Sequence, residues 1–223
     1  VLSKSAEDSE YALRQFAGAQ VNLVKNFFTD NSKELKKAAE KLRWLHPTST
    51  PYRHAANGKM ERENETSIAG TRCSAEGGGL AHPWWPTGVK YYNFAHNITH
   101  VGKDGTTPYF KRFGYDFDGE WFALGQLLHF RPVETVRDLL PKFGKRTVPG
   151  VFLGWKLHPG DVFRKEYYVS ALSDFETRDT NQPVPIYTIK EIVRHHEVRF
   201  PLAEARDRDE VMVKAIDYQR PPP

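Results

Sequence analysis

Two acidic residues occupy positions from which their carboxylates could hold a divalent metal ion. Asp30 follows a short run of β-forming residues, and Glu61 lies 31 positions later, near the start of a predicted helix. Carboxylate oxygens are the ligands that Mg²⁺ and Mn²⁺ prefer, and they leave coordination positions open for phosphate oxygens. Two such ions, about 3.5–4 Å apart, would activate a nucleophile and stabilise a leaving oxygen. The pair therefore predicts a site for metal-assisted phosphoryl transfer.

Each acid also has a plain structural interpretation. An aspartate at the end of a strand, followed by a helix that a serine caps, is usually part of a turn. A glutamate in the first turn of a helix complements the helix dipole. The metal hypothesis depends on the two acids occurring together with the segments 49–52 and 57–60 that lie between them.

The elements that must position the two acids alternate between helix and strand. Residues 5–17 predict a helix, because Ser5 is a plausible N-cap, acids fill the first turn and Gly18 follows. The β-formers of 21–28 predict a strand that ends just before Asp30. Three further helices are expected over 32–43, 57–76 and 83–98.

After Gly102 the pattern changes to short apolar runs separated by turn signals. The runs cover 127–130, 148–157, 162–171 and 184–193. Runs of this length and spacing are typical of strands, and together they indicate a small barrel or a curved sheet.

Composition limits the partners and the compartment. The chain has 223 residues, a net charge of +4 and a sequence pI near 9.0, with no block of like charge. This charge is only weak evidence for a polyanionic partner. Cys73 is the single cysteine, which excludes an intrachain disulfide and a cysteine-rich zinc site and fits a reducing intracellular compartment. No apolar run approaches the roughly 20 residues of a membrane helix.

Several motifs follow one another in the order found in the integrases of copia-type retrotransposons. Thr29–Leu35 resembles the family's Asp-Asn element before a helix, His46–Tyr52 its Ser-x-Pro-Tyr stretch, and Asn57–Asn64 the opening of its catalytic helix. Further similar segments are Leu80–Trp85, Thr107–Tyr109, Arg112–Gly114 and Lys142–Trp155. The resemblance extends from Val1 to about residue 175.

This resemblance implies an α/β fold with three parts. A partial RNase H-like core of the retroviral integrase type would occupy 1–100, a β-rich region 101–175, and a tail of strand and linker 176–223. The complete enzyme would process the 3′ ends of retrotransposon DNA and transfer them to a target strand, with Asp30 and Glu61 holding Mg²⁺ or Mn²⁺. The chain would then be a fragment of a Pol polyprotein.

The same resemblance implies partners and a location. DNA, both the element ends and the target, would be the partner, and the complete enzyme would be a homo-oligomer without a membrane attachment. It would act in the nucleus or in a cytoplasmic virus-like particle. Asn57, Gly58 and Lys59 would form a flexible, basic approach to the DNA, and Asn64 would contact it from one helical turn after Glu61. Without the resemblance, these residues are a turn and a surface lysine.

Two departures from the family pattern bear on activity. The family's core uses three acids, and the first has no counterpart here, because Asp8 falls on a predicted helix. The interval between Asp30 and Glu61 is also shorter than in retroviral relatives. The chain is therefore expected to be inactive alone. The alternative function is that of an inactive or reused integrase relic, acting as a DNA-binding or interaction module, and a purely structural α/β domain is a third hypothesis.

Overall fold

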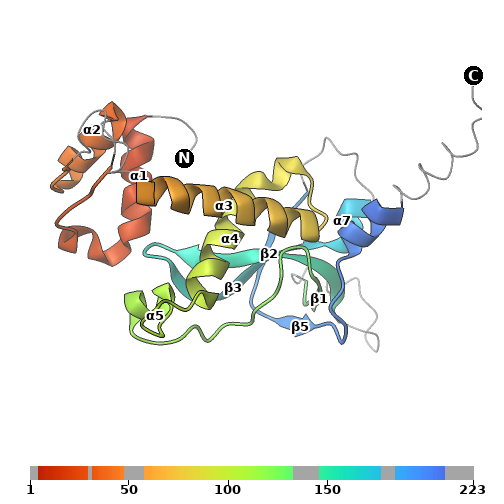
Figure 1. Cartoon of the computed structure of the whole chain (residues 1–223). Helices are drawn as coiled ribbons and strands as arrows, with labels where there is room; N and C mark the ends of the chain where they lie inside the picture. The colour runs from red at the N-terminus through yellow and green to blue at the C-terminus, as the bar shows by residue number, and fades with distance from the viewer. Residues whose placement is uncertain (1–4, 30–31, 48–57, 133–145, 177–183, 209–223) are drawn as a thin grey trace, which may run out of the picture. The chain divides into compact units, whose positions relative to one another are not determined.

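The computed structural model describes residues 5–29, 32–47, 58–132, 146–176 and 184–208 (Figure 1). The chain divides into two compact units. Unit 1 comprises Val1–Thr66 with Leu157–Arg164, and unit 2 comprises Ser67–Lys156 with Lys165–Pro223. The predicted division into 1–100, 101–175 and 176–223 stays a prediction.

Helix α1 (Ala6–Ala17) begins at a serine cap and ends at a glycine. The Ser5 hydroxyl accepts a hydrogen bond from the Asp8 amide N–H at 3.0 Å, which satisfies an amide that the first turn leaves without a carbonyl partner. Gly18 follows with a φ of 57°, a conformation that glycine adopts without steric cost. The helix predicted over residues 5–17 is confirmed.

Helix α2 (Lys33–Leu42) is capped in the same way. The Ser32 hydroxyl accepts a hydrogen bond from the Leu35 amide N–H at 3.4 Å. At the other end Arg43 takes the left-handed conformation, and its amide N–H donates to carbonyls of the last turn. The helix predicted over residues 32–43 is confirmed.

The strand predicted over residues 21–28 is wrong in its first half. Gly18–Leu23 form a 3₁₀ helix, η1, and the extended backbone starts after it. Val21 and Val24 stand three residues apart, and both pack against the core of unit 1. A spacing of three places both side chains on one side of a 3₁₀ turn, whereas in a strand they would face opposite sides. The packing of the two valines therefore decides the local structure.

The second half of the same segment pairs with the chain that follows α2. Asn26 and Leu45 form a parallel bridge. The Phe27 amide N–H donates to the Leu45 carbonyl at 2.8 Å, and the Leu45 amide N–H donates to the Lys25 carbonyl at 3.2 Å. The sequence thus correctly placed an extended segment directly before Asp30.

A small core lies between α1, α2 and this paired segment. The Trp44 side chain is buried in it, and its Nε1–H donates to the Val21 carbonyl at 2.8 Å. The buried members are Ala17, Ala39, Leu42 and Trp44, with Leu13, Val21, Val24 and Phe27 partly buried against them.

Three further α-helices among the described residues precede the sheet in the sequence. They are α3 (Gly58–Gly77), α4 (Trp85–Thr99), which follows the 3₁₀ turn η3 (His82–Trp84), and α5 (Pro108–Phe113). Helices α3 and α4 approach closely, since a Cβ added at Gly70 would lie 2.0 Å from the Tyr92 ring. The helices predicted over 57–76 and 83–98 are confirmed.

Five strands form one sheet in the order β4-β3-β2-β1-β5. They are β1 (Leu127–Phe130), β2 (Val148–His158), β3 (Val162–Ala171), β4 (Tyr187–Ile189) and β5 (Ile192–Arg194), with the short helix α7 (Leu172–Glu176) between β3 and β4. Strand β1 pairs antiparallel with β2 and β5, and β3 pairs antiparallel with β4. The predicted strands are confirmed, although the run 184–193 divides into two.

The connection between β4 and β5 requires the sheet to curve. These strands are at opposite edges of the sheet, yet only Lys190 and Glu191 separate Ile189 from Ile192. In a flat sheet the outer two of five strands would lie about 19 Å apart, whereas three peptide units reach at most about 11 Å. The two edges therefore approach each other at this end, as in a small barrel, which agrees with the predicted barrel or curved sheet.

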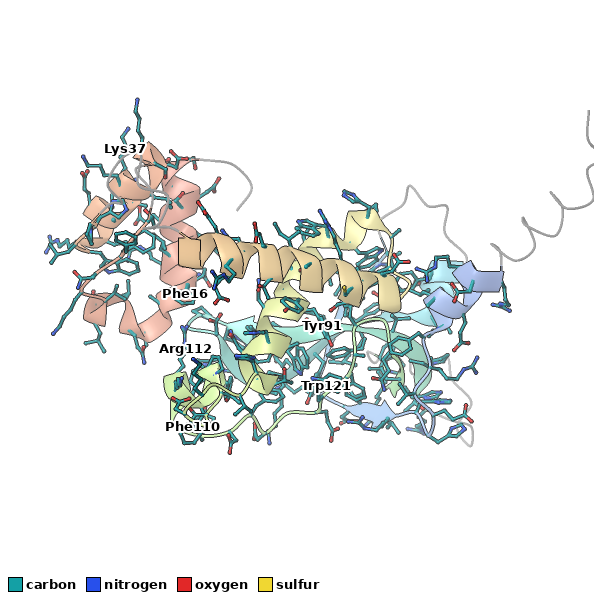
Figure 2. All side chains as sticks on the ribbon, in the orientation of Figure 1. Phe16, Lys37, Tyr91, Phe110, Arg112 and Trp121 are labelled. Carbon is teal, nitrogen blue, oxygen red and sulfur yellow. The ribbon has the colours of Figure 1, made fainter. Side chains whose placement is uncertain are left out.

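Helix α4 lies over the sheet (Figure 1). Aromatic side chains form the contact between them. The ring of Tyr91, labelled in Figure 2, stacks on Trp155 of β2 with 5.4 Å between centroids, and the Tyr91 hydroxyl donates to the Phe122 carbonyl at 3.1 Å. Phe94 contacts the same indole with 5.2 Å between centroids. Both α4 side chains are buried.

The observed architecture is thus a mixture of helices and an antiparallel sheet. The RNase H-like arrangement expected for residues 1–100 stays a prediction. Within the described ranges, no helix is both long and apolar enough to cross a membrane.

A fragment that ends at residue 100 should fold poorly. It keeps Tyr91 and Phe94 but loses Phe152 and Trp155, which cover them. Each large side chain left uncovered forgoes about 1.5–3 kcal/mol, against a typical domain stability of about 5–15 kcal/mol. We expect residues 1–100 to aggregate, or to unfold in urea without a sharp transition, while the full chain unfolds cooperatively. A monomeric fragment with two-state unfolding would contradict this account of the core.

Alkaline pH should destabilise the chain through Tyr91. Burial raises the pKa of Tyr91 to about 12, whereas an exposed tyrosine ionises near pH 10. Between these values only the unfolded chain ionises at this residue, so stability falls as pH rises, by up to about 1.4 kcal/mol per pH unit. Urea melts at about pH 8, 10 and 11 measure this loss. The loss should be smaller in Tyr91→Phe, and an equal loss in both chains would exclude Tyr91 as its source.

Candidate metal and nucleic-acid site

Asp30, the first of the two predicted acids, lies outside the described residues, as does Asn57. The approach of Asp30 to Glu61 therefore stays a prediction. The described residues on either side of Asp30 are Thr29 and Ser32, and each forms a side-chain hydrogen bond. The backbone that enters and leaves this position is thus anchored at both ends.

Thr29 is anchored through the side chain of His46. Thr29 Oγ1 lies 2.6 Å from His46 Nε2, across the paired segments. The His46 ring stacks on Phe27, with 5.5 Å between centroids and 23° between planes, and Phe27 packs edge-on against Trp44 at 5.8 Å. A series of contacts therefore connects the buried indole to the residue before Asp30.

The other ring nitrogen of His46 has an unusual environment. His46 Nδ1 is buried and has no hydrogen-bond partner among the residues that the structure describes. A neutral imidazole has one nitrogen that donates and one that accepts a hydrogen bond. In His46, Nε2 takes one of these roles toward Thr29, and Nδ1 is left with the other. Sequence reasoning included Thr29 and His46 in its motifs but gave neither a role, because their contact depends on the parallel pairing of distant segments.

Glu61 lies in the first turn of α3, which begins at Gly58. Its side chain is exposed, and no hydrogen bond or ion pair joins it to another described residue. Asn64 is also exposed and lies three positions later, on the same face of the helix. Lys59 belongs to the helix, but its side chain is outside the described part of the structure.

A magnesium site formed by Asp30 and Glu61 stays a prediction. Across the described ranges, no three His, Cys, Asp or Glu side chains are grouped to hold a metal ion. An Mg²⁺ ion that acts on phosphates is commonly held by one or two carboxylates, with water and phosphate oxygens completing the octahedron. The exposed carboxylate of Glu61 suits one such ligand, and Asp30 is the predicted second.

Helix α2 carries a group of exposed basic side chains that sequence reasoning did not single out. They are Lys33, Lys36 and Lys37, the last labelled in Figure 2. None of the three forms an ion pair at contact distance with another described residue. Lys41 differs, since it pairs with Glu7 at 3.1 Å, and this hydrogen bond raises the pKa of Lys41. The first two turns of α2 therefore present positive charge to solvent.

Comparisons with solved structures give distant similarity only. No protein-family model matches the chain, and no curated protein matches it. Among solved structures, it is similar to a chain in the cryo-EM structure of the simian T-cell lymphotropic virus intasome in complex with the PP2A regulatory subunit B56 gamma, with 15% identity and a TM-score of 0.38. The match covers 87% of this chain and 66% of that chain. A similarity at this level does not define a fold family.

Removing the Thr29 hydroxyl should loosen the end of the paired segment. Thr29→Val leaves His46 Nε2 without its partner, so we expect a loss of about 1 kcal/mol in the free energy of unfolding. Urea melts of the full chain measure it. Thr99→Val is the matched control, because the Thr99 hydroxyl is exposed and bonds only to the Ala95 carbonyl within α4. Equal losses in both variants would show that the Thr29–His46 bond contributes no more to the free energy of unfolding than an exposed hydroxyl on a helix.

Proposed function

We propose that the chain is part of a copia-type integrase, which processes the 3′ ends of retrotransposon DNA and transfers them to a target strand. The order of the motifs between Thr29 and Trp155 carries this proposal. Local structure supports it, since an extended and paired segment precedes Asp30 and Glu61 stands in the first turn of a long helix. The chain would be released from, or remain part of, a Pol polyprotein.

Asp30 and Glu61 are the proposed ligands of Mg²⁺ or Mn²⁺. The ion, when bound, would supply an activated nucleophile and offset the charge on the leaving oxygen. The Thr29–His46 bond restricts the backbone just before Asp30.

The residues at the start of α3 are the proposed contacts to the DNA end. Asn57, Gly58 and Lys59 would approach the phosphates, and Asn64 would contact the DNA from the face that carries Glu61. The exposed lysines in the first two turns of α2 would add phosphate contacts, which position the DNA without reading its sequence.

Strand transfer of this type needs a further acid to bridge two metal ions. Glu7 and Glu10 of α1 are unsuited to this role, because both pair with Lys41 and Glu10 also pairs with Arg14. We therefore expect the bridging acid to come from outside these 223 residues, and the chain alone to be inactive. The complete enzyme would be a homo-oligomer in the nucleus or in a cytoplasmic virus-like particle.

A joining assay tests the proposed activity. It compares the 223-residue chain with a longer polypeptide that adds the residues encoded directly upstream. We expect only the longer polypeptide to join a labelled DNA end to a plasmid in Mg²⁺. Asp30→Asn and Glu61→Gln should each lower joining by at least about a hundredfold, because each removes a metal ligand.

Glu63→Gln is the matched control, since Glu63 is an exposed glutamate two positions after Glu61 and so lies on a different face of the same helix. Joining should stay within about twofold of the unmodified enzyme in this variant. Full activity of Glu61→Gln would reject Glu61 as a ligand. Joining by the 223-residue chain would reject the need for a further acid.

The alternative function is that of an integrase relic which binds DNA or another partner without catalysis. The ion pairs of Glu7 and Glu10 favour it, because these two acids are not available to complete a metal site. A net charge of +4 implies few phosphate contacts and a shallow dependence of affinity on salt. Salt-sensitive DNA binding that Glu61→Gln leaves unchanged, together with no joining by the longer polypeptide, would establish this second function.

A further inference from the structure

A pocket of about 250 Å³ opens at one end of the curved sheet in unit 2. It is independent of Asp30 and Glu61 and of the function proposed for them. Four strands and the short helix α7 contribute to its walls. The residues that define its chemistry are Phe130 of β1, Val148 of β2, Ala171 of β3, Asp174 of α7, and Tyr187 and Ile189 of β4.

The walls of the pocket are mostly apolar and aromatic. Phe130 and Ile189 are buried, and Phe130 lies directly opposite Val148 in the register of β1 and β2. The rings of Phe130 and Tyr187 stack with 6.1 Å between centroids and 27° between planes. An occupant must therefore bring apolar surface, and a positive charge would gain from the faces of the two rings.

One carboxylate stands in this apolar setting. Asp174 is half-buried, and its Oδ2 accepts a hydrogen bond from the Tyr187 hydroxyl at 3.3 Å. Within the described residues, Asp174 has no other hydrogen bond and no ion pair. A carboxylate offers about four acceptor positions, so most of this group's capacity is unused. A donor-rich cation would satisfy it, whereas a phosphate would be repelled.

The edge of the sheet beside the pocket suits an extended peptide. Strand β4 pairs with β3 on one side, and no other described strand pairs with it. Tyr187 and Ile189 are alternate residues and so face the same side of the sheet. A peptide that paired with β4 at Tyr187, the end away from the β4–β5 connection, would place a side chain on that same side, next to the pocket.

We propose that this pocket binds the side chain of a lysine in an extended segment of a partner protein. The methylene stem would lie against Phe130, Val148 and Ile189, and the ammonium group would reach Asp174 and the faces of the aromatic rings. The surface would thus recruit a basic protein segment rather than nucleic acid.

Binding is tested by NMR on the ¹⁵N-labelled full chain with three short peptides. They are identical except for a central lysine, norleucine or glutamate. We expect the lysine peptide to cause saturable shifts at the amides of Ala171, Tyr187 and Ile189. The norleucine peptide, which keeps the stem without the charge, should bind at least about fivefold more weakly, and the glutamate peptide should not bind.

Two comparisons separate the parts of the proposal. Asp174→Asn should weaken lysine-peptide binding at least about fivefold, while Asp118→Asn, which changes an exposed aspartate paired with Lys165, should leave it unchanged. Butylammonium, which has the cation but no peptide backbone, should also bind at least about fivefold more weakly than the lysine peptide.

Equal binding of the lysine and norleucine peptides would overturn the cation site, and this comparison holds even if Asp174→Asn fails to fold. Equal binding of butylammonium would overturn the role of the peptide backbone. No saturable shift at the three amides would overturn the pocket as a docking site. None of these outcomes depends on metal binding or DNA joining, so the failure of either proposal leaves the other testable.

Discussion

The contact between α4 and β2 is the interaction on which the described structure of unit 2 depends. Tyr91 and Phe94 project from the helix onto Trp155, and Phe152 completes the group of rings. Phe94 and Trp155 are 61 positions apart in the chain, so the core cannot close until both the helix and the central strands have been made. The other strands depend on this contact because they are built outward from β2 on either side.

In unit 1 the corresponding feature is the small core around Trp44, which packs against the segment that leads to Asp30. The Trp44 side chain donates a hydrogen bond to the Val21 carbonyl and packs against Phe27. Phe27 in turn stacks on His46, which contacts Thr29. The support before the position of Asp30 is therefore packed, whereas the Glu61 side chain is exposed. Functional residues are commonly found at the ends of elements that a packed scaffold holds in place.

The sequence predicted those features that short-range chemistry determines. The serine caps at Ser5 and Ser32 marked two helices, because a cap bonds to an amide only three residues away. Features set by distant contacts were missed or misassigned. Val21 lies in a 3₁₀ turn that ends just before Val24, and both side chains pack against the core of unit 1. The Thr29–His46 bond spans 17 positions. The types and order of Asp30 and Glu61 could be recognised in the sequence, but their distance could not.

The two residues between β4 and β5 connect the two edge strands of the same sheet and so limit how far its edges can separate. Lys190 and Glu191 hold opposite edges of the same sheet, and Glu191 is itself tied to Arg131, the residue after β1, by an ion pair of 3.1 Å. A single backbone cut at this connection would leave β4 attached to the sheet only through β3, and β5 only through β1. Adding or removing one residue there would change the circumference of the barrel, so this position tolerates less variation in length than an ordinary surface turn.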